Sequence, residues 1–153
     1  MHYVLDSSVV IKWYLRENLS DEARHLKDRI RERSQVVAVP RLFFVESANI
    51  LWKKCRLVKE IGTHDAKGIY AQILDLPLHI IEDDEILLKA LNLSLEHSVS
   101  IYDAVYLACA LRTNVTLVTA DAAFTKRIKD PVMQKHVHYI GTVSRSAASD
   151  KNW

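Results

Sequence analysis

The apolar residues of this chain fall into short runs that are separated by longer amphipathic segments. The runs have the length of buried strands and occupy residues 2–5, 36–39, 78–81, 115–118 and 137–140. The intervening segments predict helices at residues 8–15, 20–33, 41–56, 63–74, 83–97, 103–112 and 121–129. Short, continuously apolar strands that alternate with helices are typical of a parallel sheet covered on both faces. The pattern therefore predicts an α/β protein, a three-layer α/β/α sandwich around a central, mainly parallel five-stranded sheet.

Length and composition fit one domain. The 153 residues suffice for a single ordinary core, and no repeat or low-complexity linker divides them. We expect a domain at residues 1–143 and a polar, flexible tail at residues 144–153. No apolar run reaches the ~18 residues that a membrane span needs, and no charged segment precedes the first strand, so we expect a cytoplasmic protein. Cys55 and Cys109 lie in apolar helical segments and are expected to be reduced thiols.

Four carboxylates occupy hydrophobic contexts in which an ionised group is costly. Asp6 and Asp121 each follow an apolar strand, Asp103 is the only charge within residues 101–108, and Glu46 interrupts a largely apolar helix. A carboxylate in apolar surroundings favours its neutral form unless a positive charge pairs with it. No Lys or Arg is adjacent to Asp103 or Asp121 in the sequence. We therefore predict that the missing partner is a divalent cation.

The predicted topology brings these acids to one edge of the sheet. Ligands of open parallel sheets bind beyond the carboxyl ends of the strands, where Asp6 and Asp121 lie and where the helices of Glu46 and Asp103 begin or pass. Two carboxylates ~5 Å apart repel by roughly 3 kcal/mol at an effective dielectric constant of about 20, so four ionised acids need a counter-charge. Ligand sets made of oxygen alone favour Mg²⁺ or Mn²⁺, which position phosphates and activate water for phosphodiester hydrolysis.

Each acid also has a purely structural interpretation. Asp6, Asp103 and Asp121 are acceptable helix N-caps, and Glu46 is acceptable on the solvated face of an amphipathic helix. The net charge of +2 does not decide between the interpretations. If the four acids gather in one site, however, the rest of the surface is more basic, which suits a polyanionic substrate.

The four acids stand in the segments LDSSV at residues 5–9, FVESAN at 44–49, YDAVYLA at 102–108 and TADAAF at 119–124. In this order and in these strand and helix contexts, the segments resemble the acidic motifs of PIN-domain ribonucleases, and most closely those of the VapC toxins of toxin–antitoxin pairs. The resemblance covers the chain from Tyr3 to Ile140. It implies a Mg²⁺- or Mn²⁺-dependent endoribonuclease that cuts single-stranded RNA, commonly forms a homodimer and is held inactive by a small antitoxin protein.

The resemblance also implies roles for individual residues. The catalytic, metal-binding acids would be Asp6, Glu46, Asp103 and Asp121. Ser8 and Thr119 align with small hydroxyl residues that support the site, and Asn49, one turn after Glu46, would orient it.

The sequence departs from the family pattern at Ala123, where many relatives carry an acid or Asn. This departure favours a resting site with one metal ion, which a second ion would join together with the RNA.

Basic residues near these motifs are candidates for contacts with RNA phosphates. They are Lys12, Arg29, Arg33 and Lys53. The alternative is that they belong to ordinary solvated helix faces, where acids are interleaved with them.

Two other functions remain open at this stage. A catalytically silent PIN-like module would bind RNA or protein without cleaving it, and the complete set of four acids argues against this. A receiver-type phosphoacceptor domain also places acids beyond parallel strands, but it needs an early acid pair and a Lys after the last strand, where this chain has Gly141 and Thr142.

Overall fold

The computed structural model describes residues 1–82 and 84–142. Its strands form one sheet in the order β3-β2-β1-β4-β5, and every pairing is parallel. The strands are β1 (Tyr3–Leu5), β2 (Val37–Pro40), β3 (His79–Ile81), β4 (Thr116–Thr119) and β5 (Val137–Tyr139). The predicted α/β class and five-stranded sheet are confirmed, and the sheet is wholly rather than mainly parallel.

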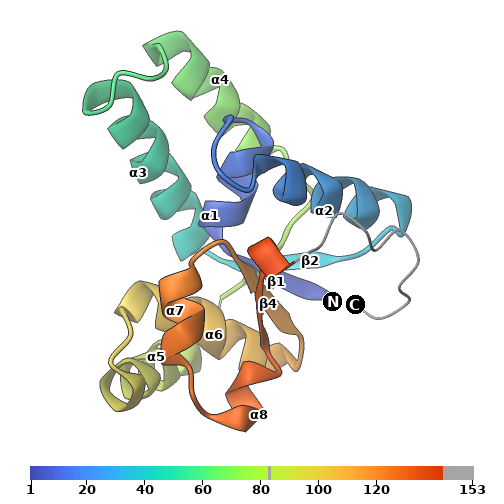
Figure 1. The fold of residues 1–153 in the computed structure, drawn as a ribbon, viewed down its shortest axis with the longest axis vertical. Helices are drawn as coiled ribbons and strands as arrows, with labels where there is room; N and C mark the ends of the chain where they lie inside the picture. Colours follow the sequence, from blue (N-terminus) through green and yellow to red (C-terminus); the bar gives the residue numbers. More distant parts are fainter. Residues whose placement is uncertain (83, 143–153) are drawn as a thin grey trace.

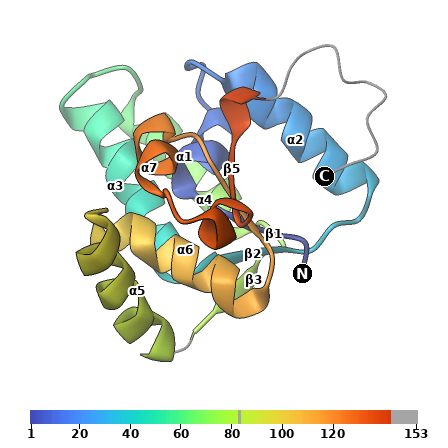
Figure 2. The ribbon, with the colours of Figure 1, turned by 60° about the horizontal axis from the view of Figure 1, so that its bottom comes forward.

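Helices cover both faces of this sheet (Figure 1, Figure 2). They are α1 (Ser7–Val10), the 3-10 turn η1 (Ile11–Trp13), α2 (Ser20–Glu32), α3 (Leu42–Arg56), α4 (Thr63–Leu74), α5 (Asp84–His97), α6 (Ile101–Thr113), α7 (Ala122–Arg127), α8 (Pro131–Gln134) and the 3-10 turn η2 (Ile140–Thr142). Helix α6 lies across β1, β2 and β4 with α5 packed against it, and α1 and α2 lie on the opposite face. Helices α3 and α4 pack side by side and extend away from the sheet, at the upper left of Figure 1.

The central strands and α6 form the core because both of their sides are covered. All residues of β1 and β2 are buried, as the continuous apolar runs predict for a parallel sheet between helices. In α6, residues 104–110 are buried without interruption, which is typical of a helix that is apolar all round. Because β1 is central, the residue that follows it lies between the segments that follow β2 and β4.

Several predicted boundaries differ from the structure. The helix predicted at 8–15 is two short pieces, α1 and η1. The helix predicted to run to residue 129 ends at Arg127, and Pro131 begins α8 instead of only ending its predecessor, because a proline at the first helical position loses no hydrogen bond. The boundary at residue 143, the tail at 144–153 and the start of a helix at residue 83 lie outside the described residues.

Two further expectations concern the membrane and the thiols. No helix within the described residues is long and apolar enough to cross a membrane. Neither Cys55 nor Cys109 forms a disulfide within the described residues, and Cys109 is buried in α6, whereas Cys55 is only partly buried.

We expect Phe43 to anchor the start of α3. Its side chain is fully buried and meets Phe44 edge to face. Phe43→Ala should lower the free energy of unfolding by about 3–5 kcal/mol, since it removes a large buried ring and leaves a cavity. Val45→Ala, on the same helix but 65% exposed, should change it by less than about 0.5 kcal/mol. Urea unfolding measures both values, and equal losses in the two variants would contradict this assignment of the core.

Candidate metal centre

Asp6 lies immediately after the central strand β1 and is the N-cap of α1. Its Oδ1 accepts a 3.1 Å hydrogen bond from the backbone N–H of Ser8 and a 3.3 Å hydrogen bond from Oγ of Ser7. Its Oδ2 accepts a 2.6 Å hydrogen bond from Oγ1 of Thr119. Oγ of Ser8 accepts a 3.2 Å hydrogen bond from the N–H of Ala120, which ties the loop after β1 to the loop after β4. Asp6 is therefore fixed at the carboxyl edge of the sheet.

Thr119, the last residue of β4, connects Asp6 to Asp121. Its hydroxyl donates to Asp6 and accepts a 3.0 Å hydrogen bond from the N–H of Asp121. Oδ1 of Asp121 accepts hydrogen bonds from the N–H groups of Ala123 and Phe124, at 2.7 and 2.9 Å, so Asp121 is the N-cap of α7. Asp6 and Asp121 are thus true helix caps and at the same time neighbours at one edge. The structural and the functional interpretations of these two acids are compatible.

Glu46 reaches the same edge from the second turn of α3. Its Oε2 accepts a 2.5 Å hydrogen bond from the hydroxyl of Tyr106 on α6. The same oxygen accepts a 3.3 Å hydrogen bond from Oγ of Ser7, which also lies 3.3 Å from Oδ1 of Asp6. One serine hydroxyl is therefore shared between two carboxylates, and it places Glu46 beside Asp6.

Asp103 enters from the first turn of α6. The helix begins at Ile101 with Ser100 as its N-cap, two residues before the predicted start. Oγ of Ser100 donates a 2.6 Å hydrogen bond to Oδ2 of Asp103 and accepts a 3.1 Å hydrogen bond from the N–H of Asp103. This reciprocal pair resembles a capping box and fixes the Asp103 side chain at the beginning of the helix. Asp103 is therefore not the N-cap itself.

Glu46 is electrostatically coupled to two of the other acids. Burial raises the pKa of the Glu46 carboxyl, and the negative charges of Asp6 and Asp103 raise it further. The hydrogen bonds from Tyr106 and Ser7 act in the opposite direction but do not cancel the effect. These surroundings therefore make ionisation of Glu46 less favourable than ionisation of a carboxyl in water, a cost that a nearby cation would offset.

Asp103 has the same electrostatic character. Burial raises the pKa of its carboxyl, and the charges of Asp6 and Asp121 add to this effect. Ser100 and the positive charge of Arg127 lower the pKa without reversing the shift. No Lys or Arg is adjacent to Asp103 in the sequence, but α7 brings Arg127 near it in space. The coupling joins all four predicted acids into one cluster around Asp6.

The chemistry of this cluster fits a hard divalent cation. All four side chains offer carboxylate oxygen and not the nitrogen of His or the sulfur of Cys, and among the described residues the side-chain hydrogen-bond donors to Asp6, Glu46 and Asp103 are neutral hydroxyls. Within residues 1–82 and 84–142, however, no group of three or more His, Cys, Asp or Glu side chains lies close enough to hold an ion as it stands. The acids therefore form a coupled cluster and not a closed coordination shell.

The remaining predicted site residues lie around the cluster. Ser8 and Thr119 make the hydrogen bonds that connect its loops. Asn49 is exposed on α3, and among the described residues Ser7 and Tyr106, rather than Asn49, donate to Glu46. The role of Asn49 in orienting Glu46 stays a prediction.

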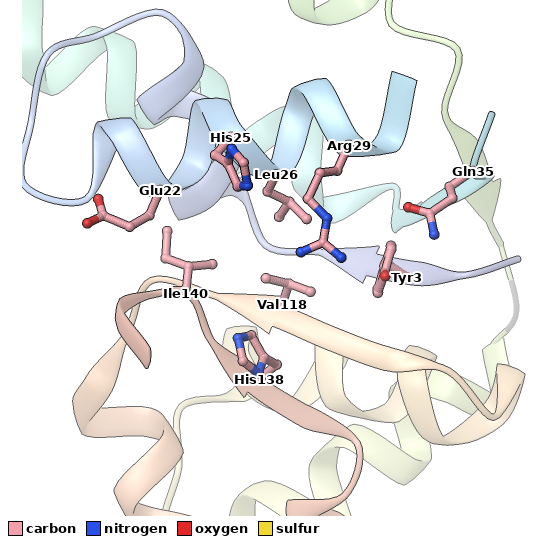
Figure 3. Close-up of a pocket in the computed structure, with 9 residues that line it drawn as sticks. All are labelled: Tyr3, Glu22, His25, Leu26, Arg29, Gln35, Val118, His138 and Ile140. Carbon is pink, nitrogen blue, oxygen red and sulfur yellow. The ribbon is translucent and has the colours of Figure 1, made fainter. Parts of the chain in front are cut away.

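The four predicted RNA contacts differ in their availability. Lys12 is only 13% exposed and forms a 2.8 Å ion pair with Glu17, so it is engaged within the protein. Arg29 lies in a small pocket on the sheet side of α2, above Tyr3 at the beginning of β1 (Figure 3). That position is at the opposite end of the strand from Asp6, and the exposed Arg33 is the C-cap residue of the same helix.

Lys53 has the most favourable position of the four. It is exposed on α3, two helical turns or about 10 Å beyond Glu46 and on the same side of the helix. A strand of RNA that leaves the acid cluster along α3 would pass this side chain.

The sequence pattern does not reveal Ser7, Tyr106 and Ser100 as site residues, although each donates to a cluster carboxylate. Ser100 has a detectable signal, since Ser followed three residues later by an acid is a capping pattern. Ser7 and Tyr106 lie inside the quoted motifs, but their contacts with Glu46 depend on how α1, α3 and α6 pack together. No local pattern predicts that packing.

The family model of the PIN domain matches residues 3–129. This chain belongs to the PIN-domain family. The recognised motifs and the α/β fold agree with that membership.

Among PIN-domain relatives, the chain is similar to ribonuclease VapC3 of Pyrobaculum aerophilum, with 29% identity in an alignment of 131 residues that covers 83% of this chain and 95% of the relative. A solved structure of a Pyrobaculum aerophilum protein has a TM-score of 0.65 and 22% identity, covering 93% of this chain and 91% of that one. A toxin–antitoxin complex from Klebsiella pneumoniae has a TM-score of 0.61 and 16% identity, covering 90% and 97%. The chain is thus a distant homologue of VapC ribonuclease toxins.

The raised pKa of Glu46 leads to a prediction about stability. In EDTA at pH 7, Glu46→Gln should raise the melting temperature by roughly 2–4 °C, the effect of about 1 kcal/mol in a domain of this size. The reason is that Gln removes a buried negative charge that Asp6 and Asp103 disfavour, while it can still accept from Tyr106. The gain should disappear near pH 4. A carboxyl whose pKa is raised in the folded state is protonated there, so Glu46 carries no charge for the variant to remove, and the wild-type protein loses stability only as the pH rises and Glu46 ionises.

Glu17→Gln is the matched control of opposite sign. Burial alone raises the pKa of Glu17, but hydrogen bonds and charges from Lys12 and Lys54 outweigh it and lower the pKa overall. Glu17 forms ion pairs with these lysines, with distances of 2.8 and 2.6 Å between the lysine Nζ atoms and the carboxylate oxygens. Glu17→Gln should therefore lower the melting temperature at pH 7. Thermal denaturation followed by circular dichroism measures both variants. A destabilised Glu46→Gln protein in EDTA would contradict the electrostatic account.

Proposed function

We propose that this protein is a Mg²⁺- or Mn²⁺-dependent endoribonuclease that acts as the toxin of a toxin–antitoxin pair. The observation that carries the proposal is the coupling of Asp6, Glu46, Asp103 and Asp121 at the carboxyl edge of the sheet. Membership of the PIN-domain family and distant homology to a VapC ribonuclease support it.

Each acid of the cluster has a distinct part in this proposal. Asp6 forms the centre of the cluster, and hydrogen bonds fix both of its carboxylate oxygens. The hydroxyl of Thr119 connects Asp6 to the backbone N–H of Asp121. Burial and neighbouring negative charges disfavour the ionised forms of Glu46 and Asp103, which a bound cation would stabilise. A divalent ion held by these carboxylates would supply charge for the scissile phosphate and lower the pKa of an attacking water.

The substrate and protein partners are part of the proposal. RNA would reach the acids along α3, where Lys53 offers a phosphate contact. A small antitoxin and a second copy of the chain are the expected protein partners, and homologues have been crystallised in toxin–antitoxin complexes. Exposed apolar side chains on two helices support protein contacts of this kind. They are Leu87, Leu88, Leu91 and Leu95 on α5 and Val45 and Trp52 on α3.

Asp121→Asn tests the proposal directly. Asparagine caps a helix as well as aspartate does, so the fold should be kept while the charge is lost. We expect the wild-type protein to cleave RNA with Mg²⁺ or Mn²⁺ and to lose cleavage in EDTA. The variant should lose at least about 100-fold in rate, the usual scale for removing a group that acts on transition-state charge.

Asp130→Asn is the matched control, because Asp130 caps α8 through two backbone hydrogen bonds just as Asp121 caps α7. It lies outside the acid cluster and should leave cleavage unchanged. Cleavage of a fluorescent single-stranded RNA gives the rates, and circular dichroism verifies folding. Full activity of both Asp6→Asn and Asp121→Asn, or activity of the wild type that persists in EDTA, would overturn the proposed function.

A further inference from the structure

The two oxygens of the Glu46 carboxylate have different surroundings. Oε2 accepts the hydrogen bonds from Tyr106 and Ser7, at 2.5 and 3.3 Å. Among the described residues, no hydrogen bond reaches Oε1. Because the hydroxyl of Ser7 is shared with Asp6 at the same 3.3 Å, the short contact from Tyr106 is the one that fixes the carboxylate.

Tyr106 is well placed to act on Glu46 without touching the RNA. It lies three residues after Asp103 on α6, so both side chains are on the same side of that helix. The residue is 2% exposed, and α6 packs across β1, β2 and β4, which leaves the side chain little freedom to move. A phenol is neutral near pH 7, so its hydroxyl donates to the carboxylate and does not neutralise it.

From this geometry we infer that Tyr106 is a positioning residue for the metal-binding carboxylate of Glu46. By binding Oε2, it holds the flexible side chain in one rotamer and leaves Oε1 available to a cation that the neighbouring carboxylate of Asp6 would also bind. The inference rests on the proposed metal-dependent function. Side chains that orient metal ligands in this way typically contribute ~10–100-fold to metal affinity.

Tyr70 offers a matched comparison within the same chain. Its hydroxyl donates a 3.2 Å hydrogen bond to the backbone carbonyl of Phe44, also on α3 and two residues from Glu46. Tyr70→Phe therefore removes one phenol hydroxyl and one hydrogen bond to α3, as Tyr106→Phe does. Only the second variant removes a hydrogen bond to a cluster carboxylate.

The experiment compares Mn²⁺ binding by the wild type, Tyr106→Phe and Tyr70→Phe proteins with isothermal titration calorimetry. We expect Tyr106→Phe to weaken Mn²⁺ binding by about 10-fold or more, and Tyr70→Phe to change it by less than about twofold. Melting temperatures in EDTA show whether each variant is folded before metal is added. Equal Mn²⁺ affinity of the wild type and a folded Tyr106→Phe protein would overturn the inference.

Kinetics separate positioning from a direct role in RNA binding. Tyr106→Phe should raise the Mn²⁺ concentration that gives half-maximal cleavage, while the KM for RNA at saturating Mn²⁺ stays within about twofold of the wild-type value. Excess Mn²⁺ should then restore the rate. A raised KM with an unchanged Mn²⁺ requirement would overturn the inference in favour of RNA contact.

The same measurements distinguish failure of the inference from failure of the proposed function. A wild-type protein that binds Mn²⁺ but does not cleave RNA would refute the endoribonuclease, and calorimetry would still decide the role of Tyr106. A wild-type protein with no measurable Mn²⁺ binding would overturn both.

Discussion

The mutual repulsion of four carboxylates at one edge of the sheet is the constraint on which the candidate site depends. An all-parallel sheet forces Asp6 and Asp121 to the same edge, because every strand ends there. Helices α3 and α6 add Glu46 and Asp103, and burial raises the pKa of both. The fold thus holds these carboxylates together although they repel one another. A bound cation would replace this repulsion with a stabilising attraction.

The polar groups that hold the acids are mainly neutral. Hydroxyls of Ser7, Tyr106 and Thr119 orient the cluster without supplying positive charge. The chain treats Glu17 differently, since two lysines pair with that carboxylate and lower its pKa. The domain can thus pair an acid directly with lysines, whereas the side-chain hydrogen-bond donors to Asp6, Glu46 and Asp103 are neutral hydroxyls, which leaves room for a cation. Arg127 moderates this charge near Asp103 but does not form one of the described ion pairs.

The sequence predicts those features that follow from position along the chain. An acid directly after a buried run must lie at the carboxyl edge of a parallel sheet, so the pattern alone suffices to place Asp6 and Asp121. The hydrogen bond from Tyr106 to Glu46 could not be predicted, because it spans 60 residues and depends on how the fold places α3 relative to α6. Lys12 lies close to a motif in the sequence, but its engagement with Glu17 depends on how η1 meets the chain that follows it. Local pattern thus predicts the acids, and tertiary packing determines the groups that hold them.

Anomalous diffraction from Mn²⁺-soaked crystals without RNA tests the central claim most directly. The account predicts an anomalous peak among the carboxylates of Asp6, Glu46, Asp103 and Asp121, and the alanine at position 123 favours a single peak. Two strong peaks within the cluster would contradict the one-ion resting state. Absence of any peak there, in crystals that bind Mn²⁺ elsewhere, would contradict the assignment of these acids to a metal centre.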